Sequence, residues 1–169
     1  MRNRSIQPRA SNRAVRFLSN GTRDRDTRFV ILAARFHPAI ADALVRGATR
    51  TLHRCGIPAS NVQLLWVPGA FELPVVAAHI AARRLAPSAI IALGALIRGR
   101  TPQYEVIAHA VAGGLSHVAV TAKIPVTFGV IVAETLAQAE ARAGGGGGNR
   151  GEEAALAALA VLRVLEGIE

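Results

Sequence analysis

The chain of 169 residues contains a single cysteine, Cys55, and only 4% aromatic residues. One thiol cannot close an internal disulfide or form a cysteine-based metal site. With so few rings, the core must be built from Ala, Val, Leu and Ile, and an apolar content of 51% is ample for one domain of this length. The sequence also lacks an uninterrupted apolar run long enough to span a membrane. We therefore expect one cytoplasmic domain.

Acidic residues are scarce near the N-terminus, and most of the net charge of +9 lies there. Residues 1–28 hold eight Arg and two Asp, whereas the rest of the chain holds 12 basic and nine acidic residues. Their low apolar content predicts that residues 1–27 form a disordered basic arm ahead of a domain over residues 28–169. A simple solvated arm is the favoured interpretation. Binding to nucleic acid or another polyanion, and a targeting role, are the alternatives.

The rest of the chain alternates between short apolar runs and helical patterns. Strands are predicted at residues 28–34, 62–67, 88–97 and, as a fourth region, 118–120 with 125–132. Helices are predicted at residues 37–55, 71–85, 102–115 (with Thr101 as N-cap), 134–143 and 152–165. The five glycines at 144–148 are interpreted as a hinge. This alternation predicts βαβ units, and hence an α/β fold: a three-layer αβα sandwich with a flavodoxin-like, four-stranded parallel sheet.

Unusual residues gather where the predicted strands end. Residues 35–37 (RFH) follow the first strand, residues 68–72 (PGAFE) the second and residues 98–103 (RGRTPQ) the third, while Phe128 lies within the fourth. In open parallel sheets, ligands bind beyond the carboxyl ends of the strands. These segments therefore predict one ligand site at that edge.

The residue types suggest what the site binds, although each has a structural alternative. Arg100 and Thr101, just before a predicted helix, suit a phosphate group, or form a solvated turn. Phe36 suits a flat heterocycle, or belongs to the core. Glu72 suits a polyol, or stabilises the first turn of a helix. The His, Asp and Glu residues show no metal-ligand spacing, so we predict no metal site.

Five segments resemble the 6,7-dimethyl-8-ribityllumazine synthase family in order and spacing. They are WVPGAFELP (66–74), ALGALIRGRTP (92–102), PVTFGV (125–130), QAEARAG (138–144) and GNRGEEAA (148–155). The resemblance implies condensation of 5-amino-6-(D-ribitylamino)uracil with 3,4-dihydroxy-2-butanone 4-phosphate. The products would be 6,7-dimethyl-8-ribityllumazine, phosphate and water, in riboflavin biosynthesis and without a cofactor.

The resemblance also implies roles for individual residues. Phe36 would stack on the pyrimidine. Arg150 occupies a position where the family usually has Lys. A neighbouring subunit would supply Phe128 and Arg142, so the family assembly, a homopentamer that can extend to a 60-subunit icosahedral shell, is expected. Riboflavin synthase is a further candidate partner. The remaining substrate-binding positions are Ala70, Phe71, Glu72, Ala95, Leu96 and Ile97. The phosphate-binding positions are Arg100, Thr101 and Arg142, and Arg142 is also a predicted catalytic residue.

One position departs from the family pattern: Gln103 stands where the family has its proton-transfer histidine. An amide cannot exchange protons near neutral pH, and general acid–base catalysis typically contributes about 10²–10⁴-fold. We expect a slowed enzyme or, as the alternative, a paralogue that binds lumazine or flavin or acts as a shell protein. His109 is expected to point away from the site. His37 is a candidate substitute, or an N-cap or solvent-facing residue.

Overall fold

A four-stranded, all-parallel sheet forms the middle of the molecule. The computed structural model describes residues 27–168, with strands β1 (Phe29–Ala34), β2 (Val62–Val67), β3 (Ala89–Ile97) and β4 (Val126–Ala133). Their order across the sheet is β2-β1-β3-β4, with β1 and β3 central. This is the predicted flavodoxin-like order.

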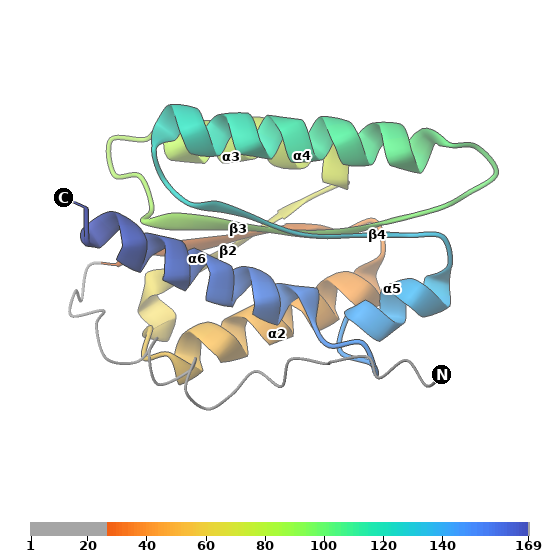
Figure 1. Ribbon diagram of the computed structural model, residues 1–169, viewed down its shortest axis with the longest axis horizontal. Helices are drawn as coiled ribbons and strands as arrows, with labels where there is room; N and C mark the ends of the chain where they lie inside the picture. Colours follow the sequence, from red (N-terminus) through yellow and green to blue (C-terminus); the bar gives the residue numbers. More distant parts are fainter. Residues whose placement is uncertain (1–26, 169) are drawn as a thin grey trace, which may run out of the picture.

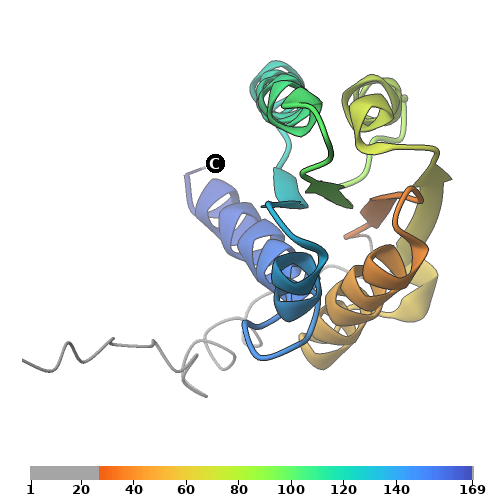
Figure 2. The same ribbon diagram turned by 90° about the vertical axis from the view of Figure 1, so that its right-hand side faces the viewer.

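Helices cover both faces of the sheet, which confirms the predicted three-layer sandwich (Figure 1). Helices α3 (Leu73–Ala81) and α4 (Gln103–Ala122) lie on one face. The other face carries α2 (Pro38–Arg54), α5 (Leu136–Arg142) and α6 (Arg150–Glu166), as the end-on view in Figure 2 shows. Short 3-10 turns, η1 (Ala59–Asn61) and η2 (Ala70–Glu72), flank β2.

The predicted basic arm lies outside the described residues, apart from its last member. Thr27 is buried, and its carbonyl oxygen accepts a hydrogen bond from Asn61 Nδ2 at 3.1 Å. Thr27 therefore packs with the domain.

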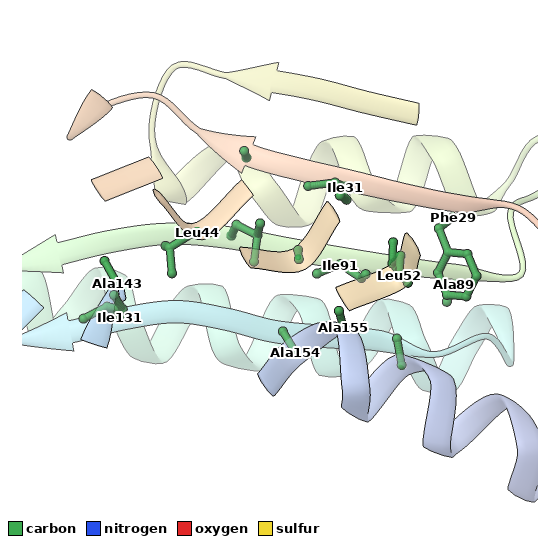
Figure 3. Close-up of a cluster of buried hydrophobic side chains, with 14 of the residues drawn as sticks. Phe29, Ile31, Leu44, Leu52, Ala89, Ile91, Ile131, Ala143, Ala154 and Ala155 are labelled. Carbon is green, nitrogen blue, oxygen red and sulfur yellow. The ribbon is translucent and has the colours of Figure 1, made fainter. Parts of the chain in front are cut away.

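Two aliphatic clusters, one on each face of the sheet, make up the core. Every side chain of β1 is buried, and alternate residues point to opposite faces. Figure 3 shows Phe29 and Ile31 facing Leu44 and Leu52 of α2 and Ala155 of α6. Small alanines let the helices lie close to the strands, as the scarcity of aromatic residues predicts.

Helix α4 is longer than predicted, and the strand prediction at residues 118–120 is wrong. The helix continues to Ala122 and ends at Lys123, whose φ of 56° is left-handed. Val111, Leu115 and Val118 follow one another at spacings of four and three and are all buried against the sheet. Burial of this continuous stripe outweighs the preference of β-branched residues for strands.

By length and composition, α4 is the one described helix apolar enough to cross a membrane. In the structure it is a covering helix of the sandwich, packed against α3, β3 and β4. Its outward side includes exposed Val106 and Val120. A Cβ on Gly114 would come within 2.8 Å of Pro74, so glycine allows α4 to approach α3 closely.

The glycine run 144–148 forms a closed turn instead of an open hinge. Gly144 N donates to Gly148 O at 2.9 Å, and Gly147 N donates to Ala141 O at 3.0 Å. Gly144 and Gly148 have φ values of 117° and 87°, which favour glycine. The run therefore supplies backbone conformations that close the turn between α5 and α6.

The buried side chain of Asn149 fixes this turn to the rest of the molecule. Its Oδ1 caps α6 by accepting hydrogen bonds from Gly151 N at 2.9 Å and Glu152 N at 3.1 Å. Its Nδ2 donates to Ala43 O of α2 and to Ala143 O at the end of α5, both at 3.0 Å. One amide thus joins three helices.

Replacement of Asn149 should separate these two contributions. Asn149→Ala removes the cap and the amide that donates to the Ala43 and Ala143 carbonyl groups, the second of them buried, so we expect the free energy of unfolding to fall by about 2–4 kcal/mol. Asn149→Ser keeps a capping oxygen and should recover about 1 kcal/mol of that loss. Urea denaturation followed by circular dichroism, at one protein concentration, measures both changes. Equal stability of the Ala variant and the parent would contradict this assignment.

Candidate active site

The carboxyl ends of β1 and β3 create a crevice at one edge of the sheet. The last paired residues of these strands are Ala33 and Leu93, and β3 then continues beside β4 until Ile97 pairs with Ala133. After β1 the chain enters α2 on one face, whereas after β3 it enters α4 on the other (Figure 1). A reversal of this kind is where open α/β sheets bind their ligands.

A hollow of about 470 Å³ occupies this crevice. Its volume is within the usual range for small-molecule sites. It brings together segments that the sequence placed at strand ends, one following β1, one at the end of β3 and one opening α4. Its predicted lining residues are Phe36, His37, Ala95, Leu96, Ile97, Thr101 and Gln103.

Phe36 is held outside the core at the mouth of this hollow. Its side chain is 75% exposed, so the core alternative does not apply. Its ring meets the His37 ring edge-on, with centroids 5.1 Å apart and an interplanar angle of 83°. An exposed ring at a strand end offers a face on which a planar heterocycle can stack.

His37 is half-buried and sits at the N-cap position of α2, directly before Pro38. Its side chain does not cap the helix. Among residues 27–168, the imidazole contacts the Phe36 ring and its nitrogens form no hydrogen bond. The nitrogens can therefore bind a ligand. The N-cap alternative therefore describes its backbone position but not the use of its side chain.

The loop after β3 carries the residues predicted to bind phosphate. Arg100 and Thr101 are exposed, and Thr101 lines the hollow, whereas Arg100 does not. The loop is fastened at its start, because Arg98 N donates to Ala133 O at 2.9 Å and the Arg98 guanidinium lies 3.6 Å from the Glu134 carboxylate. The predicted helix start shifts by one residue, since Pro102 occupies the N-cap position.

Tyr104 lines the hollow although sequence reasoning did not single it out. Its hydroxyl donates a hydrogen bond to Glu105 Oε1 at 2.8 Å, and this bond raises the pKa of Tyr104 above its ordinary value. The phenol therefore stays protonated at neutral pH and acts as a donor. The sequence feature that could have identified Tyr104 is its position next to Gln103, in the first turn of the helix that follows β3.

Phe71 and Glu72 line a separate hollow of about 490 Å³ between α3 and α4. Phe71 is 62% exposed, and the neighbouring Ala70 is buried. Glu72 Oε2 accepts a hydrogen bond from Gly69 N at 2.9 Å, which ties down the turn after β2. The structural alternative for Glu72 is therefore realised, while its second carboxylate oxygen stays available to a ligand.

Arg142 and Arg150 share the carboxylate of Glu153. Arg142 Nη2 lies 2.9 and 3.0 Å from the two Glu153 oxygens, and Arg142 Nη1 donates to the Gly147 carbonyl. Arg150 Nη1 contacts Glu153 Oε2 at 2.6 Å. Within one chain, neither arginine lines the hollow that contains Phe36 and Thr101.

Phe128 also lies outside that hollow, on the edge strand β4, where it is 40% exposed. For metal binding, His, Cys, Asp and Glu form no group of three or more in the described part of the chain. One chain therefore presents an aromatic ring, a hydroxyl and an amide around one hollow. Outside its lining lie the other predicted site residues, which are Ala70, Phe71, Glu72, Arg100, Phe128, Arg142 and Arg150.

The fold and the crevice define a flavodoxin-like α/β protein with a hollow at the point where the strand order reverses. A sequence model of the 6,7-dimethyl-8-ribityllumazine synthase family matches residues 26–166. The chain belongs to this family, whose members are transferases of riboflavin biosynthesis. The family resemblance inferred from the five segments is thereby confirmed.

Two phenylalanines of the same chain segment provide a matched test of the site. Phe29 begins β1 and is 1% exposed, whereas Phe36 follows the strand and is 75% exposed. We expect Phe29→Ala to lower the free energy of unfolding by about 3–5 kcal/mol, and Phe36→Ala by less than about 0.5 kcal/mol. Urea denaturation measures both variants. A large loss for Phe36→Ala would mean that its ring supports the fold.

Proposed function

We propose that this chain condenses 5-amino-6-(D-ribitylamino)uracil with 3,4-dihydroxy-2-butanone 4-phosphate to give 6,7-dimethyl-8-ribityllumazine. The observation that carries the proposal is the hollow at the carboxyl ends of β1 and β3, which presents an exposed ring, a hydroxyl and an amide in a chain that matches the family over residues 26–166. The family match supplies the reaction, and the hollow supplies a place for it.

Each end of the hollow suits one part of the substrates. Phe36 stacks on the pyrimidine, and the end of β3, from Ala95 to Ile97, forms the floor beneath it. Thr101 and Arg100 bind the phosphate near the start of α4, where backbone N–H groups and the helix dipole favour an anion. Holding both substrates in register lowers the barrier, and donors around the phosphate stabilise it as it leaves.

A neighbouring subunit completes the site in this proposal. Phe128 and Arg142 do not reach the hollow of their own chain, and Phe128 is exposed on an open sheet edge. Glu153 holds Arg142 in a fixed orientation, yet both side chains remain partly exposed, at 36% and 43%. The guanidinium can therefore bind a phosphate of an adjoining chain while keeping its carboxylate partner.

Gln103 gives the site its distinctive property. The amide lines the hollow and can orient a substrate group by hydrogen bonding, but it cannot transfer a proton near neutral pH. We expect a working but slowed enzyme, because positioning and phosphate binding do not depend on this residue. A paralogue that binds lumazine or flavin without turnover is the alternative.

A single-turnover assay distinguishes the enzyme from the binding protein. Purified protein mixed with both substrates should form the lumazine faster than the same mixture without protein, and Gln103→His should raise that rate because it restores an imidazole in the hollow. Absorbance of the product measures the rate. Tight binding of the lumazine without any acceleration would favour the paralogue.

The assembly can be tested independently of turnover. A pentamer should sediment with five times the chain mass of 17.7 kDa, and a shell with a larger multiple. Phe128→Asp places a charge on the exposed β4 edge and should weaken the assembly, whereas Phe36→Asp, at a more exposed ring, should leave it intact. A wild-type monomer at micromolar concentration would contradict the shared site.

A further inference from the structure

The proposed condensation requires proton transfer that the residues at the start of α4 do not provide. When the amine attacks the ketone, a C–N bond forms and the carbonyl π bond breaks. The two amine protons then move to the ketone oxygen, which departs as water and leaves the imine. A group that takes up and returns protons near neutral pH accelerates both transfers.

The hollow contains one side chain of this kind. Gln103 and Thr101 form hydrogen bonds but do not exchange protons in this range. Tyr104 is held as a donor by Glu105, whose carboxylate raises the pKa of the phenol. His109 is absent from the lining, and its Nδ1 lies 2.8 Å from Glu105 O, one turn back along α4. His37 is the remaining candidate.

The position of His37 suits this role. It adjoins Phe36, where the proposed function places the pyrimidine that carries the attacking amine, and its side chain is not used to cap α2. It lines the same hollow as Gln103 and Tyr104. Of the arginines in the segments around the hollow, Arg35 stacks on Trp66 at 4.8 Å and Arg98 pairs with Glu134. Arg100 is exposed and lies outside the lining.

We infer that His37 is the proton-transferring catalytic residue of this chain, acting from the segment after β1 in the hollow that Gln103 also lines. This inference rests on the proposed condensation. Neutral imidazole takes the first proton from the nitrogen of the adduct and delivers it to the oxygen. It then takes the second nitrogen proton and passes it to the departing hydroxyl, so that water leaves and the imidazole is unchanged.

The test compares His37→Gln with His109→Gln, a histidine exchange outside the hollow. We expect His37→Gln to lower the single-turnover rate constant by about 10²-fold, and His109→Gln to change it less than twofold. The dissociation constant of the lumazine product, measured by fluorescence titration, should stay within threefold of the parent value for both variants. Unchanged circular dichroism and sedimentation establish that both variants fold and assemble.

Two further readouts separate proton transfer from a merely structural effect. The decrease in rate at acidic pH, which reports protonation of the base, should disappear in His37→Gln. Gln103→His should raise the rate by a larger factor in the His37→Gln background than in the parent, because it restores the missing imidazole from the α4 side. A Gln103→His gain of equal size in both backgrounds would overturn the inference.

The outcomes also separate this inference from the proposed function. A parent protein that accelerates the condensation, together with a His37→Gln variant of equal rate and pH profile, overturns only the role of His37. A parent protein that binds both substrates but shows no acceleration overturns the proposed condensation, and the role of His37 with it.

Discussion

The buried amide of Asn149 is the constraint on which the helical layer of α2, α5 and α6 depends. It caps α6, holds the end of α5 and reaches across to Ala43 of α2, so three helices meet at one side chain. In addition, Gly47 leaves room for it, because a Cβ there would overlap the amide. Ala143 and Asn149 form an antiparallel β-bridge that closes the turn. Arg142 directly precedes this bridge and Arg150 directly follows it, and both arginines contact Glu153. The spacing between the arginines is therefore a property of the capped turn, and glycines form that turn because two of its residues have positive φ.

The carboxyl edge of the sheet is shaped by the unequal lengths of its strands. β3 has nine residues and β1 has six, so the end of β3 projects past β1 and leaves a floor that no neighbouring strand covers on that side. Because α2 and α4 begin on opposite faces, neither helix closes the gap. Phe36 and His37 stand on one side of this floor and the start of α4 on the other. The hollow is thus a consequence of topology, and the side chains around it determine which chemistry it can support.

The sequence was sufficient to predict the layers, the strand order and most of this hollow, because those features follow from periodicity and chain direction. Residues 62–67 were predicted as a strand with the observed bounds. The errors came from tertiary contacts. Residues 118–120 have strand-like composition, but Val118 extends the buried stripe of α4. The five glycines gave no sign of the hydrogen bonds that close their turn, and the four contacts of Asn149 join residues as far apart as 106 positions. To predict that Tyr104 lines the hollow, the first residue of α4 would have to be known to within one position.

The distribution of aromatic residues connects the core to the site. Of the four described phenylalanines, only Phe29 is buried, whereas Phe36, Phe71 and Phe128 are 75%, 62% and 40% exposed. A chain with 4% aromatic residues and an aliphatic core therefore keeps most of its phenylalanine rings at the surface. A large ring left fully in water loses about 1.5–3 kcal/mol of burial free energy. The fold must therefore be stable without the burial of these rings. Each ring lies in a strand or in the turn that follows one, and each gains part of that free energy, in proportion to its exposed area, when a planar ligand or another chain covers it. Because the core is complete without them, these rings can contact ligand or neighbour without the fold having to change.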